Sequence, residues 1–423
     1  VHMAVAMTLV PINSTLNRVM IKEFAISATL VAVMAILPYL ISPIQVAVGY
    51  YSDRHPIWGL YRTPYILLGL LLCVAGLAVS PQIVFLIADH FWLGVLVGIL
   101  AFGAWGMGYN LAAVSYLSLA SELFGERGRG RTIAIMWFMM ITGIILTAVT
   151  VSHLVDPYTE QALLRAFWII ASIALGLGLI GLVGLEPRSQ EPVQAEERHS
   201  WKLMASTVWK NPQVRLFFVY LIILLAALLG QDILLEPYAA EAFDMPVSET
   251  TRITSLWGIF VLVALLFTGW AEARLGKRKT AAWGGGGALA GFVLITVSGL
   301  LLNETVFYLG VVLLGVGTGI STVSNLSLML DMTVAGQVGL FIGAWGMANA
   351  ISRLIGSLLA GMGRDLLTHL TANYILGYVV VFGILAGFML ISLVLLGRVD
   401  VRAFQQHGRQ SSVVERAALA SDL

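Results

Sequence analysis

The amino-acid sequence is a succession of long apolar runs separated by short polar connections. Each run is close to the roughly 20 residues that an α-helix needs to cross the hydrocarbon core of a membrane. The pattern therefore predicts an all-α polytopic membrane protein. We expect twelve membrane-spanning helices, at about residues 1–21, 28–50, 63–80, 88–118, 131–153, 164–185, 213–235, 251–272, 280–302, 304–330, 336–361 and 372–397.

The composition agrees with this pattern. Of the 423 residues, 59% are hydrophobic and only 11% are charged, with a mean hydropathy of +0.89. Such a chain is far too apolar for a soluble globular protein. The net charge of +1 gives no reason to expect a nucleic-acid partner. The single cysteine, Cys73, excludes internal disulfides, and because the chain starts at Val1 rather than Met we expect further residues before the first helix.

The longest polar connection divides the runs into six and six. We therefore expect an N-terminal half at 1–185, a linker at 186–211, a C-terminal half at 212–397 and a tail at 398–423. Most Lys and Arg residues fall in the linker, the tail and the loops after even-numbered helices. By the positive-inside rule these segments, including the C-terminus, are predicted to be cytoplasmic.

A charged pattern in the first run recurs with opposite sign in the seventh. The matching positions lie 214 residues apart, Arg18 with Asp232 and Lys22 with Glu236. Charged side chains at membrane depth are costly unless they meet a partner or a cavity. We interpret the four residues as an ion-paired lock between two duplicated halves. A proton or substrate relay and a ligand site are the alternatives.

Other polar residues are expected in the same central cavity or inter-half cluster. Arg353 is a basic residue deep inside the eleventh run, and we expect it to pair with Asp331 or with a polar group such as Asn325. The complete predicted cluster is Asn17, Arg18, Lys22, Gln231, Asp232, Glu236, Tyr238 and Arg353.

The connection between the second and third runs resembles a known signature. Its residues Gly49, Asp53, Arg54, Gly59 and Arg62 are similar to the loop motif of the major facilitator superfamily. Physically, such a motif is a latch between helix ends, in which the aspartate caps a helix or pairs with a basic residue. The resemblance implies the superfamily fold, with twelve transmembrane helices in two pseudo-symmetric six-helix halves.

A more specific resemblance extends over nearly the whole chain. The sequence is similar to the PucC family, the bacteriochlorophyll-associated branch of that superfamily, at residues 15–21, 52–53, 62–66, 231–238 and 339–346. This resemblance implies a protein of the photosynthetic inner membrane of a bacterium that delivers or inserts bacteriochlorophyll while light-harvesting antenna complexes assemble. It also implies antenna polypeptides, pigment-synthesis proteins and membrane lipids as partners, with carotenoid or lipid as further ligands.

Two other functions remain open from the sequence. The acids Asp232 and Glu236 would allow a proton-coupled transporter of an amphipathic solute. The glycine-rich stretches at 283–291 and 383–387 would allow a permanent structural subunit of a photosynthetic complex, although packing against neighbouring helices explains them as well. An enzyme is not expected, because we find no nucleophile with a base and no phosphate-binding loop.

The sequence does not identify a ligand for the magnesium of a pigment. Among the seven histidines, His2 is the one expected within a helix, while the others fall in loops, the tail or helix ends. The amides of Asn110, Asn325, Asn349 and Gln231 are equally plausible as ligands or as interhelical hydrogen-bonding groups.

Overall fold

A computed structural model describes residues 1–40, 55, 57, 59–186, 212–332 and 338–400. Of the helical residues 114, 117, 118, 120–134, 338–340 and 342, only the backbone is described. The predicted motif residues Gly49, Asp53 and Arg54 and most of the predicted linker and tail lie outside the described residues.

Helices account for nearly all of the described chain. The first half contains α1 (His2–Ala6), η1 (Pro11–Leu16), η2 (Val19–Glu23), α2 (Ala28–Leu40), α4 (Thr63–Asp89), α5 (Phe91–Leu154) and α6 (Glu160–Leu182). The second half contains α8 (Pro212–Gly230), η3 (Gln231–Ile233), α9 (Leu235–Phe243), α10 (Val247–Leu275), α11 (Lys277–Leu301), α12 (Glu304–Asp331), α13 (Val338–Thr371) and α14 (Tyr374–Leu396).

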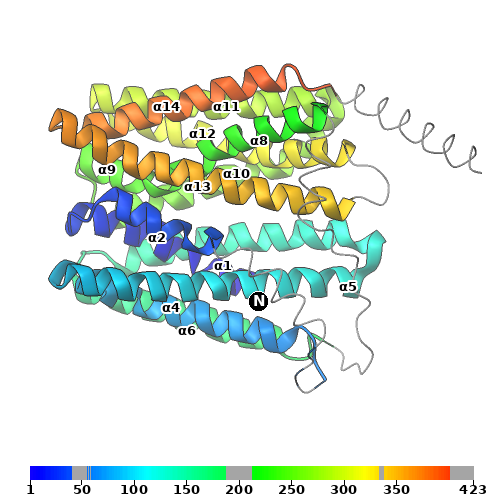
Figure 1. Cartoon of the computed structure of the whole chain (residues 1–423), viewed down its shortest axis with the longest axis horizontal. Helices are drawn as coiled ribbons and strands as arrows, with labels where there is room; N and C mark the ends of the chain where they lie inside the picture. Colours follow the sequence, from blue (N-terminus) through cyan, green and yellow to red (C-terminus); the bar gives the residue numbers. More distant parts are fainter. Residues whose placement is uncertain (41–54, 56, 58, 187–211, 333–337, 401–423) are drawn as a thin grey trace, which may run out of the picture.

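Each of the twelve predicted runs is mainly helical where the structure describes it, apart from short turns within runs and at their ends. The long helix α5 carries two of them, because its ribbon folds back at one end of the molecule (Figure 1) and contains the separate apolar spans Phe91–Ala113 and Ile135–Leu154. Nine helices within the described residues are long and apolar enough to cross a membrane. The protein is therefore a multi-pass membrane protein.

Several predicted boundaries were wrong, including the end of the eleventh helix, which was expected at residue 361 although α13 continues to Thr371. The third helix was expected to end at residue 80, but α4 continues through Pro81 to Asp89. Proline has no backbone N–H to donate to the carbonyl four residues earlier. The Ser80 hydroxyl donates to that carbonyl, of Leu77, at 2.8 Å and so replaces the missing bond. The seventh helix likewise continues beyond 235, as α9.

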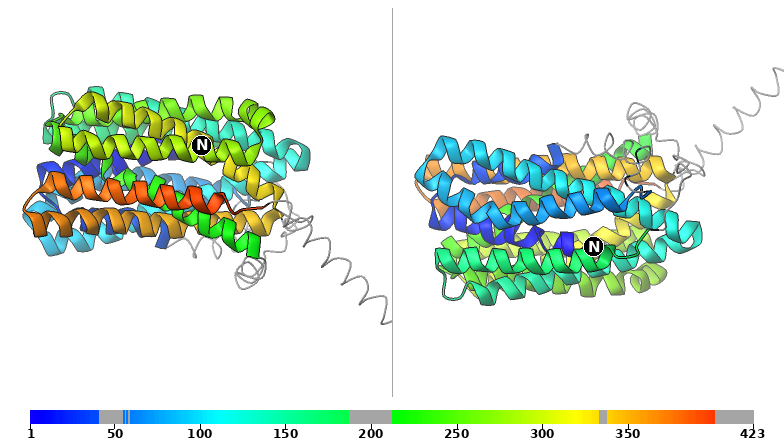
Figure 2. Two further views of the ribbon diagram at one scale, coloured as in Figure 1. Left: turned by 90° about the horizontal axis from the view of Figure 1, so that it is seen from above. Right: turned by 90° about the horizontal axis from the view of Figure 1, so that it is seen from below.

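The two halves lie side by side with their helices along a common axis. In Figure 1, α4 and α6 lie at one edge, α11 and α14 lie at the opposite edge, and α2 and α13 meet in the middle. Figure 2 shows the same alignment from two further sides. The halves contact each other mainly through α2 against α13 and through α5 against α10.

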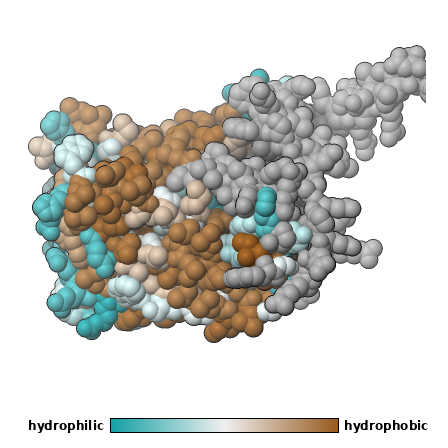
Figure 3. Space-filling model, turned by 60° about the horizontal axis from the view of Figure 1, so that its bottom comes forward, coloured by the Kyte–Doolittle hydropathy of each residue, from teal (hydrophilic) through white to brown (hydrophobic). Residues whose placement is uncertain are grey.

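The outer surface of the bundle is apolar. Large side chains such as Trp92, Ile180 and Trp283 are 82%, 74% and 71% exposed. Hydrophobic residues cover much of the face in Figure 3, and hydrophilic ones gather towards one end. Because lipid tails can cover such a surface and water cannot do so without cost, the exposed side chains are consistent with a lipid-facing bundle.

The glycine-rich stretch of α11 mostly packs inside its own half. A Cβ at Gly284 would meet Ser321 of α12 at 2.8 Å, and one at Gly291 would meet Leu314 at 2.6 Å. Small residues therefore let α11 and α12 approach closely. Gly286 of α11 and Gly387 of α14, in contrast, have nothing within 4 Å.

Candidate functional site

A cavity of about 470 Å³ lies between the two halves. Its wall is built by α1, η1, α2 and α5 from the first half and by α8, η3, α9, α10, α12 and α13 from the second. This volume lies within the range of about 300–1,000 Å³ that is typical of small-molecule sites. The position between the halves makes it the candidate functional site.

An interruption of the seventh helix places acids on the cavity wall. The 3₁₀ turn Gln231–Ile233 separates α8 from α9 and so changes the direction in which successive side chains point. Pro237 lies in the first turn of α9, where backbone N–H groups have no partner within the helix. Gln231, Asp232 and Glu236 all line the cavity as a result.

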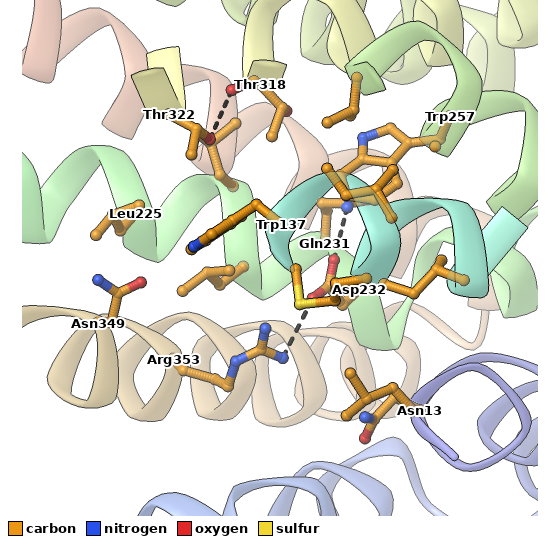
Figure 4. A pocket seen from close by; sticks show the side chains of 18 of the residues that line it. Asn13, Trp137, Leu225, Gln231, Asp232, Trp257, Thr318, Thr322, Asn349 and Arg353 are labelled. Atoms are coloured by element: carbon orange, nitrogen blue, oxygen red, sulfur yellow. Dashed lines mark hydrogen bonds and ion pairs between the residues drawn. The ribbon is translucent and has the colours of Figure 1, made fainter. Parts of the chain in front are cut away.

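Asp232 forms an ion pair with Arg353 of α13. The distance from Arg353 Nη1 to Asp232 Oδ2 is 3.2 Å, and Gln231 Nε2 donates to Asp232 Oδ1 at 2.8 Å. Figure 4 shows Arg353 and Asp232 facing each other at the cavity wall. The Arg353 guanidinium also lies over the ring of Tyr39 of α2, at 4.9 Å from its centroid. The ion pair therefore balances both charges, and the contact with Tyr39 holds Arg353 against the first half.

Glu236 joins three helices by hydrogen bonds. Its Oε1 accepts from the hydroxyl of Ser14 in η1 and from Thr254 Oγ1 of α10, the latter at 2.6 Å. The two hydroxyls are also 2.8 Å apart. The Ser14 contact crosses between the halves, so Glu236 links them beside the cavity.

The remaining wall is largely apolar. Methionine and aromatic side chains of α5, including Met136, Trp137 and Met140, face leucines of α8 such as Leu221 and Leu225. Trp137 is 41% exposed, and Figure 4 shows its ring beside the polar groups at Asp232. Flat and flexible side chains of this kind adapt to large apolar ligands.

The predicted lock is wrong in its pairing. Within the described residues, Arg18 pairs with Glu23 and donates to the carbonyl of Met245 at 3.1 Å. Lys22 lies 3.4 Å from the exposed Asp244. The predicted pairing relied on a constant sequence offset, which does not take into account the direction in which each side chain points around its helix. The π-helical turns η1 and η2 change that direction, so that Arg18 and Lys22 face the connection between α9 and α10.

Two further members of the predicted cluster lie away from the cavity wall. Asn17 donates to the carbonyl of Asn13 at 2.6 Å. Tyr238 is fully buried in an aromatic group with Phe307 and Phe382, and its hydroxyl donates to Ile295 O at 2.9 Å. Their polar atoms are satisfied within one half of the protein, which explains why neither reaches the cavity.

The predicted partners of Arg353 were also wrong. Asp331 pairs instead with Lys277 of α11 at 2.6 Å, and Asn325 accepts from the hydroxyl of Tyr220 at 2.7 Å. Arg353 and Asp232 are both on the cavity wall, whereas Asp331 ends α12. Asp331 is therefore occupied by Lys277 at the end of α12, and Asn325, although it also lines the cavity, is occupied by Tyr220.

The described part of the loop motif begins at Gly59. Arg62 immediately precedes α4, and the Glu186 carboxylate accepts from the backbone N–H groups of Tyr61, Arg62 and Thr63 at 2.7 to 3.1 Å. An acid at a helix N-terminus satisfies donors that otherwise lack partners. This cap joins the end of the first half to α4.

Some residues of the site were missed by the sequence analysis. Ser14 and Thr254 are polar residues inside apolar runs, a signal that could have identified them. Trp137 and Tyr39 carry no such signal, since aromatic residues are common in membrane helices. Among the residues considered for magnesium, His2, Gln231, Asn325 and Asn349 line the cavity, whereas Asn110 donates to Pro38 O at 2.6 Å.

The fold is similar to solved membrane transporters. A crystal structure of a mutant nucleoside transporter NupG matches with a TM-score of 0.72 and 15% identity, over 94% of this chain and 98% of that chain. A POT family transporter in complex with a thioalcohol-conjugated peptide matches with a TM-score of 0.70 and 15% identity, over 94% and 96%. These likenesses confirm the predicted fold, that of the major facilitator superfamily.

The sequence comparisons are more specific. The protein family described as PUCC protein matches residues 15–404. Protein PucC of Cereibacter sphaeroides is 30% identical over 413 residues, covering 93% of this chain and 89% of that protein. The bacteriochlorophyll synthase 44.5 kDa chain of Rhodobacter capsulatus is 29% identical over 381 residues, covering 87% and 86%. The match over nearly the whole length shows that this chain belongs to the PucC family.

Proposed function

We propose that this protein handles bacteriochlorophyll in the membrane of a phototrophic bacterium, and that it delivers or inserts the pigment while light-harvesting antenna complexes assemble. Its partners are then antenna polypeptides, pigment-synthesis proteins and membrane lipids. Membership of the PucC family and the name of the Rhodobacter capsulatus relative support the connection with bacteriochlorophyll.

The cavity between the halves is the observation that carries the proposal. Bacteriochlorophyll has a flat, largely apolar ring, carbonyl groups at the ring edge and a long isoprenoid tail. An apolar wall with a few polar groups at one place suits such a molecule. Trp137 and the methionines beside it would contact the ring, and Gln231 would reach a polar substituent. Carotenoids and lipids are also largely apolar, so the same wall would suit them as further ligands.

The proposed location is the photosynthetic inner membrane, with the C-terminus in the cytoplasm. The distribution of Lys and Arg supports this orientation, because the linker and tail sequences contain many of these residues and the positive-inside rule assigns such segments to the cytoplasm. The role requires no enzymatic step, and the solved structures that the fold resembles are transporters.

The test is pigment retention by the gently solubilised full chain from a pigment-producing host. We expect bacteriochlorophyll in a fixed ratio to the polypeptide, together with antenna polypeptides. Trp137→Ala should lower the pigment ratio several-fold. Trp283→Ala, on the outer surface, is the matched control and should leave it unchanged. A wild-type protein that is colourless and binds no added pigment would overturn the proposal.

Transport of another amphipathic solute is the second candidate. The cavity between the two halves, lined by an ion pair, favours it. Uptake of such a solute into liposomes, in a protein that retains no pigment, would support this function. Stoichiometric recovery of the chain in purified mature antenna would instead support a permanent structural role.

A further inference from the structure

Glu236 is the buried acid of the site that has no ion-pair partner within the described residues. The residue is 2% exposed. Its Oε1 receives two hydroxyl groups, from Ser14 and Thr254, while its Oε2 is buried without a hydrogen-bond partner. The nearby Arg18 is occupied by Glu23 and Met245. This arrangement differs from that of Asp232, whose charge is balanced by Arg353.

The geometry fits the neutral form of the Glu236 carboxyl group. An ionised carboxylate in a low-dielectric interior is costly unless a cation and several donors balance it. A protonated carboxyl group carries one O–H donor and still accepts hydrogen bonds. Both hydroxyls face Oε1, so the proton of the neutral acid belongs on Oε2, the atom that lacks a partner.

Loss of that proton would act directly on the contact between the halves. The Ser14–Glu236 bond joins η1 of the first half to α9 of the second, and Thr254 ties the same carboxyl group to α10. An ionised Glu236 at this position needs water or a cation, and neither can reach Oε2 while the contact stays closed. Separation of Ser14 from Glu236 would admit water.

Other charged and titratable groups surround this position. Arg18 lies on the first helix, Arg252 of α10 donates to Ser152 at 2.8 Å, and Asp232 is neutralised by Arg353. Further titratable groups on the cavity wall are His2, Tyr39, Tyr109 and Tyr116. Asp232 and Arg353 already balance each other's charge. Glu236 has no ion-pair partner within the described residues, so loss of its proton would leave an unbalanced negative charge at this position.

We infer that Glu236 is a proton-binding site and that its protonation holds the Ser14 contact between the halves closed, so that proton release opens this end of the protein. The inference concerns proton binding and goes beyond the proposed handling of pigment. It can therefore be tested on the pigment-free protein.

The first measurement is infrared spectroscopy of the full chain in lipid nanodiscs across a pH series. A carbonyl band of a protonated carboxylic acid should be present near neutral pH, disappear at alkaline pH and be absent from Glu236→Gln. Glu249→Gln, which removes an exposed acid from α10, is the matched control and should keep the band. Persistence of the carbonyl band in Glu236→Gln, or absence of the band from the wild type at every pH, would overturn the inference.

The second measurement reports the separation of the halves. Spin labels at His90 and Leu370 are placed on exposed positions where α4 and α13 end, at the same end of the molecule in Figure 1. The distance between the labels should increase at alkaline pH in the wild type and stay short in Glu236→Gln at all pH values. An equal pH response in both proteins would overturn the coupling.

A second variant provides an independent test if Glu236→Gln does not fold. Thr254→Val removes one hydroxyl that stabilises the ionised carboxylate but leaves Glu236 in place. The band should then persist to a higher pH, by about one unit, since a hydrogen bond to a charged group is lost. An unchanged midpoint in Thr254→Val would contradict the assigned geometry.

Discussion

Asp365 of α13 caps α2 by accepting hydrogen bonds from both the backbone N and the hydroxyl of Thr29, each at 2.7 Å. It also accepts from the backbone N of Ala28 at 3.2 Å. A side chain of the second half thus completes the N-terminus of a helix of the first half. Arg364 beside it pairs with Glu241 of α9 at 2.8 Å. The Asp365 bonds therefore close one end of the interface between the halves, whereas the Arg364–Glu241 pair lies within the second half.

Replacement of Asp365 by alanine should loosen this end of the interface. The change removes the cap of α2 and leaves two backbone N–H groups unpaired, which we expect to lower the free energy of unfolding by about 1–3 kcal/mol. Alkylation of a cysteine introduced at Ala28, which is fully buried, should become faster than in the parent with Asp365 intact. Thermal unfolding in detergent and the alkylation rate measure the two effects.

Asn303→Ala provides the control for the capping variant. Asn303 caps α12 through the backbone N of Val306 at 3.1 Å, and both residues belong to the second half. Its loss should reduce stability by a similar amount but leave alkylation at position 28 unchanged. Equal alkylation rates in Asp365→Ala and Asn303→Ala would show that the Asp365 contact does not close the interface.

Gly356 of α13 lies against the backbone of α8. A Cβ at this position would collide with the carbonyl of Ala226 and approach the backbone of Gly230 to 3.0 Å. Because backbone atoms cannot rotate away as a side chain can, we expect Gly356→Ala to destabilise the protein by about 1–3 kcal/mol. Thermal unfolding of the purified protein in detergent measures the loss.

Gly346 lies on the same helix and is the matched control. A Cβ there has nothing within 4 Å, so Gly346→Ala should be neutral or stabilise α13 by up to about 1 kcal/mol through its higher helix propensity. If both glycine variants lowered the melting temperature equally, an effect of the added methyl group that is common to both positions would explain the result, and close α8–α13 packing would not.

The hydrophobic pattern predicted the fold well because each crossing must present about 20 apolar residues to lipid. It also located the polar groups of the site, since Asp232, Glu236 and Arg353 are costly at membrane depth without a cavity or a partner. Ser80 shows a limit of this approach. Only the three-dimensional position of its hydroxyl explains how α4 passes Pro81 without ending.

The pairing of the charges could not be predicted from sequence offsets. The sequence offset predicts matching positions for Arg18 and Asp232 in two duplicated halves, yet Arg18 pairs with Glu23 because π-helical turns alter the phase of the first helix. Arg353 meets Asp232 because α13 packs beside η3. Such a contact between distant segments depends on helix packing, which leaves no periodic signal in one sequence.

Exchange of the charges at Asp232 and Arg353 tests this pairing. Each single change, Asp232→Arg or Arg353→Asp, places like charges together at the cavity wall and should lower the free energy of unfolding by about 2–4 kcal/mol. The double variant should recover a large part of the loss, because the two residues still face each other at the distance of an ion pair. A double-mutant cycle from reversible unfolding in detergent measures the coupling.

The combination of Arg18→Asp with Asp232→Arg is the informative control for that cycle. The two changes disrupt separate contacts, with Glu23 and with Arg353, so their costs should add within about 0.5 kcal/mol. Recovery in this combination, with none in the Asp232–Arg353 exchange, would restore the pairing expected from the sequence repeat. Recovery in the Asp232–Arg353 exchange alone would show that helix packing, and not the repeat, selects the partner of the cavity acid.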